Sequence, residues 1–197
     1  MTMREEDGVT AVRLARCIIT QEVTKKRLAY MMHIPYNEPS GVFVTINNFP
    51  DLSLRGCIGF IEPVYPFLEA LEHSARSACH DPRFPSLREK ELDNVVIDVT
   101  VLTAPKIIDV KEKEDLLTAI VIGRDGIVIE YRGRKAVFLP QVPVEWNWNV
   151  LEYLENLCMK AGIPKDRWKD KDCNVYAFHG RLFRELTPNG DAEEVKE

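Results

Sequence analysis

Apolar residues recur at steps of three and four in three segments of the chain, which is the pattern of an amphipathic helix. The segments run from about Gly8 to Met32, from Phe67 to about His80, and from about Asn149 to Ala161. The last is followed by Gly162 and Pro164, and glycine accepts the left-handed backbone of a helix end whereas proline cannot continue the helix. A shorter helix is predicted to begin in the charged stretch 111–115.

Segments rich in β-branched and aromatic residues predict strands, because such side chains suit a pleated surface. They cover residues 41–46, 53–61, 95–102, 127–131, 136–139, 175–178 and 181–186. Turn-forming residues at 47–51 join the first two segments as a hairpin, and residues 132–135 join the fourth and fifth. Hairpins with helices between them, and no regular βαβ alternation, predict an α+β fold with a mainly antiparallel sheet and flanking helices.

Two features suggest how the chain is divided. Ala104-Pro105 follows the clearest strand and is the best candidate for a domain boundary. The tail from Thr187 is polar and acidic, so we expect it to be frayed.

Composition narrows the class of protein. The 197 residues are 45% hydrophobic and 29% charged, which is typical of a globular chain, and the formal net charge of -5 disfavours a broad nucleic-acid surface. No apolar run has the roughly 18–20 residues that cross a bilayer, and residues 1–10 lack the apolar core of a signal peptide. The five cysteines include no C-x-x-C pair, which favours reduced thiols. We therefore expect a cytoplasmic protein without membrane association.

The segment Leu54-Arg55-Gly56-Cys57-Ile58-Gly59 is unusual for a strand, since two glycines weaken strand propensity and leave the backbone open to close approach. Alternation places Arg55 and Cys57 on one face, beside the space that Gly59 leaves. A guanidinium favours the nucleophilic thiolate over the thiol. Cys57 is therefore a candidate catalytic nucleophile, and Arg55, Gly56 and Gly59 are candidate ligand-binding residues.

A structural interpretation competes with this one. Free cysteine is commonly a small buried residue without reactivity, and the glycines can mark a β-bulge. Arg55 is the stronger candidate, because a charge flanked by apolar residues in a strand needs a partner.

The segment His80-Asp81-Pro82-Arg83-Phe84-Pro85 is a second candidate site. Asp81 and Arg83 are predicted ligand-binding residues, and His80 is a candidate acid or base near neutral pH. The alternative is that Asp81 organises a turn, Arg83 holds a helix end and Phe84 covers the core.

The sequence has few signals of a metal, cofactor or nucleic-acid site. The histidines do not have the short spacing of metal ligands, and no phosphate-binding or dinucleotide motif is present, so neither a metal site nor a cofactor is predicted. Arg132, Arg134 and Lys135 form a dense basic patch near Trp146 and Trp148. Because this basic and aromatic interleaving is short, nucleic-acid binding is the least favoured function.

The six-residue motif resembles the signature of the AMMECR family, whose members are also called AmmeMemoRadiSam system protein A. The similarity continues through a set of later residues: Ala75, Ala78, Asp81, Arg83, Phe84, Ile122-Gly123, Gly126, Leu139-Pro140-Gln141-Val142 and Lys160-Ala161-Gly162. The resemblance implies a larger α+β domain, residues 1–105 with 163–197, and a smaller inserted domain, residues 106–162. It also implies an association with Memo-like and radical SAM proteins and leaves the activity unestablished.

Three functions follow as hypotheses. The first is a small-molecule-binding protein or an enzyme with a cleft between the two domains, lined by Arg55, Cys57, Asp81 and Arg83, because such boundaries are common ligand sites. The second is a non-catalytic module that binds a partner protein. The third is nucleic-acid binding through residues 132–135. Whether the protein is an enzyme is left open by the sequence.

Overall fold

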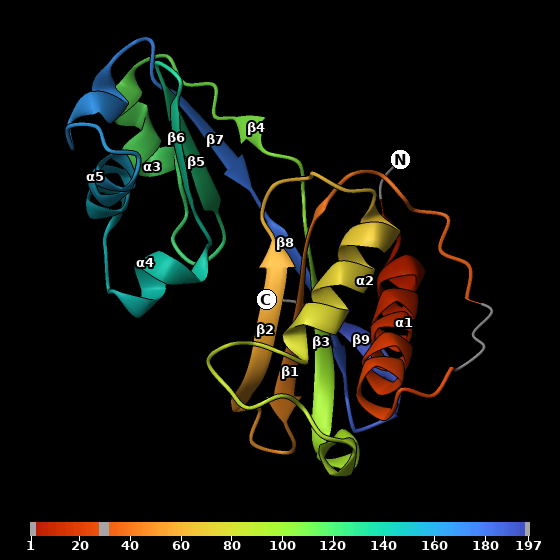
Figure 1. Ribbon diagram of the computed structural model, residues 1–197. Helices are drawn as coiled ribbons and strands as arrows, with labels where there is room; N and C mark the ends of the chain where they lie inside the picture. Colours follow the sequence, from red (N-terminus) through yellow and green to blue (C-terminus); the bar gives the residue numbers. More distant parts are fainter. Residues whose placement is uncertain (1–2, 28–31, 196–197) are drawn as a thin grey trace. The chain divides into compact units, whose positions relative to one another are not determined.

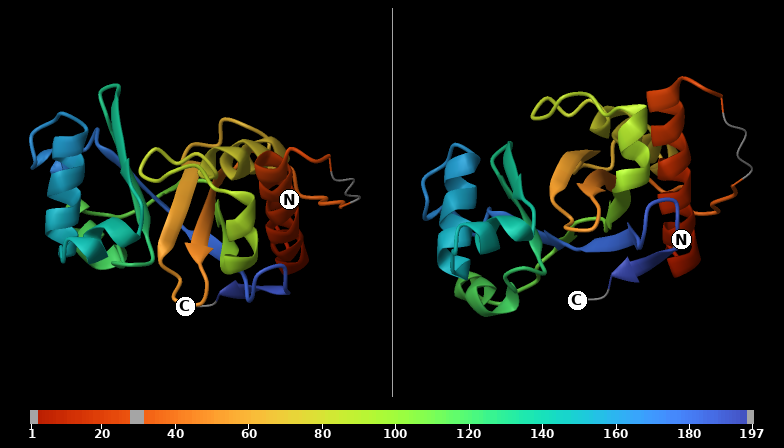
Figure 2. Two further views of the ribbon diagram at one scale, coloured as in Figure 1. Left: turned by 60° about the horizontal axis from the view of Figure 1, so that its bottom comes forward. Right: turned by 90° about the horizontal axis from the view of Figure 1, so that it is seen from below.

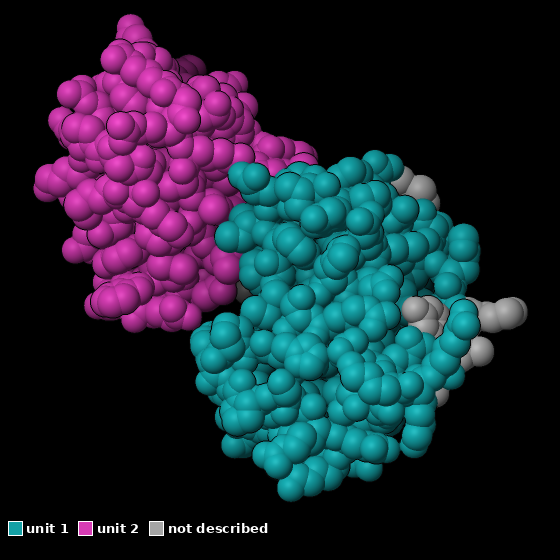
Figure 3. Space-filling model, in the orientation of Figure 1, with its two compact units in different colours: residues 1–102, 181–197 teal, residues 103–180 magenta. Residues whose placement is uncertain are grey.

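The computed structural model describes residues 3–27 and 32–195 and divides into two compact units. Unit 1 comprises residues 1–102 and 181–197, and unit 2 comprises residues 103–180 (Figure 3). Both units combine antiparallel strand pairs with helices, as an α+β fold requires.

Unit 1 is built on a five-stranded sheet in the order β2-β1-β3-β8-β9. Its strands are β1 (Gly41–Asn48), β2 (Leu54–Phe60), β3 (Val95–Leu102), β8 (Gly180–Glu185) and β9 (Ala192–Val195). The pairs β1–β2, β1–β3 and β8–β9 are antiparallel. Strand β2 therefore lies at one edge of the sheet and has β1 as its neighbour.

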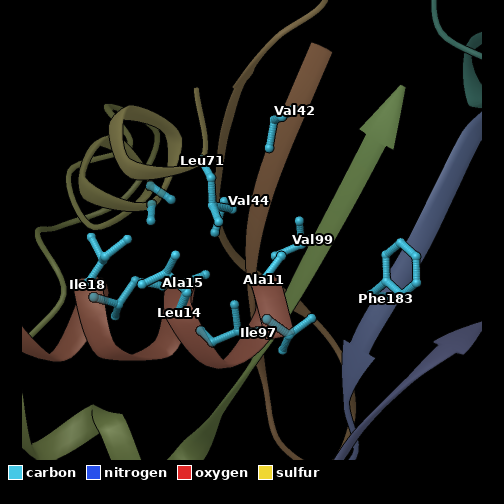
Figure 4. Packing of buried hydrophobic residues seen from close by; sticks show 14 of the residues in the cluster. Ala11, Leu14, Ala15, Ile18, Val42, Val44, Leu71, Ile97, Val99 and Phe183 are labelled. Carbon is cyan, nitrogen blue, oxygen red and sulfur yellow. The ribbon is translucent and has the colours of Figure 1, made fainter. Parts of the chain in front are cut away.

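Two helices, α1 (Glu5–Thr24) and α2 (Phe67–Ala78), cover one face of this sheet (Figures 1 and 2). A short 3-10 helix, η1 (Glu89–Asn94), precedes β3. Figure 4 shows Leu14 and Ile18 of α1 and Leu71 of α2 pointing toward Val44 and Val99 of the sheet. This apolar layer fixes which face of each strand is left for polar side chains, because successive residues of a strand point to opposite faces.

Unit 2 has a four-stranded sheet in the order β4-β7-β5-β6. Its strands are β4 (Lys106–Ile107), β5 (Gly126–Tyr131), β6 (Arg134–Phe138) and β7 (Asn174–Phe178), and its helical segments are η2 (Lys113–Asp115), α3 (Leu116–Ala119), α4 (Gln141–Glu145), α5 (Val150–Lys160) and η3 (Arg167–Lys169). Buried Tyr153, Leu157 and Trp168 pack with Ile127 and Ile129 of β5 in a core of its own.

Most predicted elements are present, and the first helix differs in extent. It ends at Thr24, where Lys25 adopts a left-handed backbone with φ of 57° and donates its N–H to the Gln21 carbonyl. Residues 25–27 lie outside the helix, and part of the predicted extension, 28–31, lies outside the described residues.

Two expectations about the C-terminal third are corrected. Residues 163–180 belong to the smaller unit, because Trp168, Cys173 and Val175 are buried in its core and β7 pairs with β5. The return to the larger unit therefore comes near residue 181 and not at 163. The tail is also more ordered than expected, since β9 pairs with β8 and completes the sheet. Among the described helices, none combines the length and the apolar character that spanning a membrane requires.

Candidate functional site

The six-residue motif lies in β2, at the edge of the sheet in unit 1. Ile58 packs toward the core beneath the helices. By alternation, Arg55, Cys57 and Gly59 have the opposite orientation. The predicted pairing of Arg55 and Cys57 on one face therefore agrees with the strand that the structure shows.

Both glycines are explained by close backbone approach. A Cβ atom at Gly56 would lie 2.5 Å from the carbonyl oxygen of Ala78, at the end of α2. At Gly59 it would lie 2.3 Å from the Val42 carbonyl oxygen in β1. Such distances are too short for any side chain, so the glycines let β2 lie against α2 and β1. Their ligand-binding role stays a prediction.

Asp81 and Arg83 together hold the outer edge of β2 at Cys57. The Cys57 N–H donates to Asp81 Oδ2 at 2.9 Å, and Arg83 Nη2 donates to the Cys57 carbonyl at 3.3 Å. Arg83 also donates to both carboxylate oxygens of Asp81, from Nε at 3.0 Å and from Nη2 at 2.7 Å. The Asp-x-Arg segment thus satisfies backbone groups that an edge strand would otherwise leave unpaired.

Asp81 and Arg83 differ in their exposure to solvent. The Asp81 side chain is fully buried, whereas that of Arg83 is 57% exposed. The guanidinium of Arg83, followed by the backbone N–H of Cys57, holds the pKa of the Asp81 carboxyl well below its usual range despite burial. Asp81 is therefore an ionised anchor, and Arg83 is a cation held beside Cys57 with much of its surface in solvent.

Arg55 is already engaged by protein groups. Its Nε donates to Glu91 Oε1 at 2.8 Å and its Nη2 to the Pro85 carbonyl at 2.9 Å, while only 12% of its side chain is exposed. The partner that a charge in this strand requires is thus Glu91 of η1. The anion-binding role of Arg55 stays a prediction, and its contacts with Glu91 and Pro85 give it a structural role.

The Cys57 side chain lies next to a hydroxyl group. Thr45 of β1 is the register partner of Cys57, and its Oγ1 donates to Cys57 Sγ at 3.1 Å. Cys57 is intermediate in exposure, whereas Cys79, Cys158 and Cys173 are buried. The Cys57 thiol therefore has a hydroxyl donor at its sulfur and the guanidinium of Arg83 at its own carbonyl.

Thr45 and Cys57 begin a polar row that crosses all five strands of the sheet in unit 1. Thr45 pairs in register with Asp98 of β3, Asp98 binds Arg184 of β8 at 2.7 Å, and Arg184 pairs with Glu193 of β9. The neighbours Val44 and Val99 belong to the core, so this row lies on the face away from the helices.

Sequence reasoning missed Thr45, Asp98 and Arg184. One signal was available, because Asp98 is a charged residue in the middle of an apolar strand and must have a partner there. Its partner Arg184 lies 86 positions away, so the spacing of residues gave no indication of the pair.

The remaining candidates have local partners. Arg132 pairs with Asp172 at 3.0 Å, Arg134 lies against the Gly162 carbonyl, and the Trp146 and Trp148 rings stack with centroids 6.0 Å apart. His80 contacts neither Cys57 nor Asp81 by a described hydrogen bond and instead lies between Ser86 and Glu22. Among residues 3–27 and 32–195, no three His, Cys, Asp or Glu side chains gather as metal ligands would.

Comparison with known proteins gives the family. The AMMECR1 family model matches residues 12–183. Protein MJ0810 of Methanocaldococcus jannaschii is 44% identical over 193 residues, covering 97% of this chain and 96% of that protein. A protein of Aquifex aeolicus is 45% identical over 161 residues, covering 81% and 82%.

A solved structure extends the comparison to three dimensions. The crystal structure of the uncharacterized protein PH0010 from Pyrococcus horikoshii aligns with a TM-score of 0.76 at 40% identity and covers 99% of both chains. Family model, sequence and fold therefore agree over nearly the whole length. The chain belongs to the AMMECR1 family, whose relatives named here carry no stated activity.

Proposed function

We propose that unit 1 binds a small polar molecule on the sheet face that carries Cys57 and the row from Thr45 to Glu193. The observation that carries the proposal is the setting of the Cys57 thiol. Its backbone N–H and carbonyl are bound by Asp81 and Arg83, and its sulfur accepts a hydrogen bond from Thr45. A group held in this way is preorganised, which is what a ligand or a reacting atom requires.

The chemistry of the site favours a ligand that offers both an electrophilic or polar atom to the thiol and an anionic group to Arg83. Arg83 is the cation near Cys57 with a large exposed surface, and a guanidinium suits carboxylate and phosphate groups. Arg55 supports the site from within through Glu91. In this arrangement Asp81 is a positioning residue and Arg83 is the ligand-binding one.

Thiol labelling tests the proposal directly. Folded protein is treated with a limiting amount of iodoacetamide at pH 7.5, and each cysteine is followed by mass spectrometry. Cys57 is expected to react first. Burial raises the pKa of Cys79 and Cys173 to about 12 and that of Cys158 to about 11, which keeps those thiols protonated. Burial also raises the pKa of Cys17.

The matched comparison is Cys17, because it shares intermediate exposure with Cys57 but lies on α1. The proposal expects Cys57 to react at least tenfold faster than Cys17, and expects Arg83→Gln to reduce that ratio. Equal rates at the two residues would contradict a specialised thiol. Protection of Cys57 by small carboxylates or phosphates in the same assay would identify the ligand class.

A partner-binding module is the second candidate, and one observation favours it. Phe49, Leu52 and Leu54 are each about 40% exposed at the turn between β1 and β2. Exposed apolar side chains in a group are typical of contact surfaces. If a Memo-like protein from the same genome docks there, Leu54→Asp should abolish its co-elution in gel filtration while Leu186→Asp, at a distant exposed leucine, leaves it unchanged. Co-elution unaffected by Leu54→Asp would exclude this surface.

A further inference from the structure

Three side chains of unit 1 are hydrogen-bonded in series on the helix-covered side of the molecule. Ser86 Oγ lies 3.1 Å from His80 Nδ1, and His80 Nε2 lies 3.1 Å from Glu22 Oε1. The three come from separate places in the chain: the loop before η1, the turn after α2, and the last turn of α1. The series is independent of Cys57, with which none of the three has a described hydrogen bond.

The charge of Glu22 decides the tautomer of His80. Hydrogen bonds from Lys25, then from His80 and Arg76, lower the pKa of Glu22 to about 2. The carboxylate is therefore ionised at neutral pH and accepts a hydrogen bond from His80 in the tautomer that carries its proton on Nε2. In that tautomer Nδ1 has a lone pair, and the Ser86 hydroxyl is the group that donates to it.

The result is the arrangement of a nucleophile, a general base and a carboxylate that orients the base. Such a series is recognised by its geometry and by the roles of its members, and not by chain order. In this protein Nδ1 faces the hydroxyl and Nε2 faces the carboxylate, the reverse of the Ser-His-Asp template. Here the carboxylate is fixed by two further cations: Arg76 Nη1 lies 3.0 Å from Glu22 Oε2, and Lys25 Nζ lies 2.6 Å from Oε1. These contacts hold Glu22 in place while it orients the imidazole.

The series is open to solvent and lies beside a hollow. Ser86 is exposed, half of the His80 side chain is exposed, and a cavity of ≈ 480 Å³ adjoins His80 and Glu22. The cavity is also lined by Ile58, Arg76, Ser77 and Pro82. Its volume accommodates a small organic molecule, and the apolar contribution of Ile58 and Pro82 suits a short acyl chain.

We propose that Ser86, His80 and Glu22 form a second, acyl-transfer site that cleaves small, unhindered carboxylic esters. Ser86 Oγ attacks the ester carbonyl as His80 Nδ1 takes the hydroxyl proton. Collapse of the tetrahedral intermediate breaks the bond to the alkoxide, which leaves with the proton from His80 as an alcohol. Water then attacks the acyl-serine, again giving its proton to His80, and the carboxylic acid departs as Ser86 regains its proton. Glu22 stays ionised and orients His80 throughout.

The experiment uses the full chain, with p-nitrophenyl acetate as the substrate and a fluorophosphonate as the covalent probe. Wild type is expected to release p-nitrophenol faster than buffer and to carry the phosphonyl label on Ser86 by peptide mass spectrometry. Ser86→Ala and His80→Gln should each reduce the enzyme-dependent rate at least tenfold. Ser53→Ala, at another exposed serine outside the series, should retain the wild-type rate.

Two results would overturn the proposal. One is a wild-type rate in Ser86→Ala. The thermal unfolding of this variant is measured in parallel, so that a reduced rate is not mistaken for loss of folding. The other is loss of the rate in Cys57→Ser with retention in Ser86→Ala, which would make the thiol the nucleophile. Iodoacetamide labels Cys57, whereas the fluorophosphonate labels Ser86. The proposal of a ligand site at Cys57 and that of an acyl-transfer site at Ser86 are therefore tested separately.

Discussion

At the residue scale, the charged side chains of the motif and of the loop after α2 hold the backbone of these two segments in place. Asp81 is buried and binds both Arg83 and the Cys57 N–H, while Arg55 binds Glu91 and the Pro85 carbonyl. Apart from the Asp81–Arg83 pair, each contact joins β2 to the segment between α2 and β3. The chemistry that remains accessible at the motif is therefore that of the Cys57 thiol, the Thr45 hydroxyl and the solvent-facing part of Arg83.

Replacement of Asp81 tests this anchoring role. Asp81→Asn keeps the shape but removes the charge that pairs with Arg83, and we expect the free energy of unfolding at pH 7 to fall by about 2 kcal/mol, the scale of a lost hydrogen bond to a charged group. Urea denaturation measures it. Asp93→Asn, at an exposed position bonded to Asn189, is expected to change stability by less than about 0.5 kcal/mol.

The pH dependence of stability also distinguishes Asp81→Asn from wild type. The pKa of Asp81 is lower in the folded protein than its ordinary value, so its stabilisation is complete above the unfolded-state pKa near 4 and is lost as the pH falls toward the folded-state value. Wild type should therefore lose stability as the pH falls below about 4, where the carboxyl of the unfolded chain takes up a proton while that of the folded protein does not. The loss should be smaller in Asp81→Asn, and identical pH profiles would contradict the assignment.

At the element scale, α1 is fixed to the sheet by one buried ion pair. Arg16 of α1 binds Glu185 of β8 and also donates to the carbonyls of Leu92 and Val95. Glu185 in turn accepts from the Ile97 N–H of β3. The helix, two strands and the end of η1 are thereby joined through a single guanidinium and its partner carboxylate.

Removing the Arg16 guanidinium should destabilise the fold, because it leaves the buried Glu185 carboxylate without its partner. Arg16→Met is expected to lower the free energy of unfolding by about 3–5 kcal/mol, measured by urea denaturation. The matched control is Arg13→Met on the same helix, since Arg13 and its partner Asp191 are both exposed. Such surface pairs contribute about 0–1 kcal/mol. A double variant, Arg16→Met with Glu185→Met, should recover part of the loss.

At the scale of the whole molecule, unit 2 is an insertion whose two ends lie together. The Thr103 N–H donates to the His179 carbonyl at 2.8 Å, and the His179 N–H donates to Thr103 Oγ1 at 2.9 Å. Each unit has its own buried core. These are the features of segments that fold as separate domains.

Excision of unit 2 tests that independence. Replacing residues 103–180 by a short glycine-serine linker should give a folded unit 1 with a single cooperative urea transition, and Cys57 should remain more reactive than Cys17. The isolated segment 103–180 should also unfold cooperatively. A shortened chain without dispersed amide resonances in its NMR spectrum would show that unit 1 depends on the insertion.

Sequence alone determined the elements that depend on local pattern. The strand 95–102, both hairpins and the helices near 67–78 and 150–160 follow from periodicity and turn residues, which act over a few positions. The α+β class follows from the same information, whereas the family was indicated by the resemblance of the motif Leu54–Gly59. The glycines of β2 were also correctly connected with close backbone approach, and α2 and β1 prove to be the elements that approach them.

Only the tertiary structure decided which residues meet. Sequence placed Arg55 beside Cys57 but could not show that the Arg55 guanidinium is bound to Glu91, 36 positions away. The row from Cys57 to Glu193 and the series Glu22, His80 and Ser86 depend on strand order and helix packing, which bring distant segments together. β9 was missed for the same reason, because an acidic, polar segment becomes a strand here by pairing with β8. Local pattern specifies which faces are apolar, whereas long-range packing selects the partners of polar side chains.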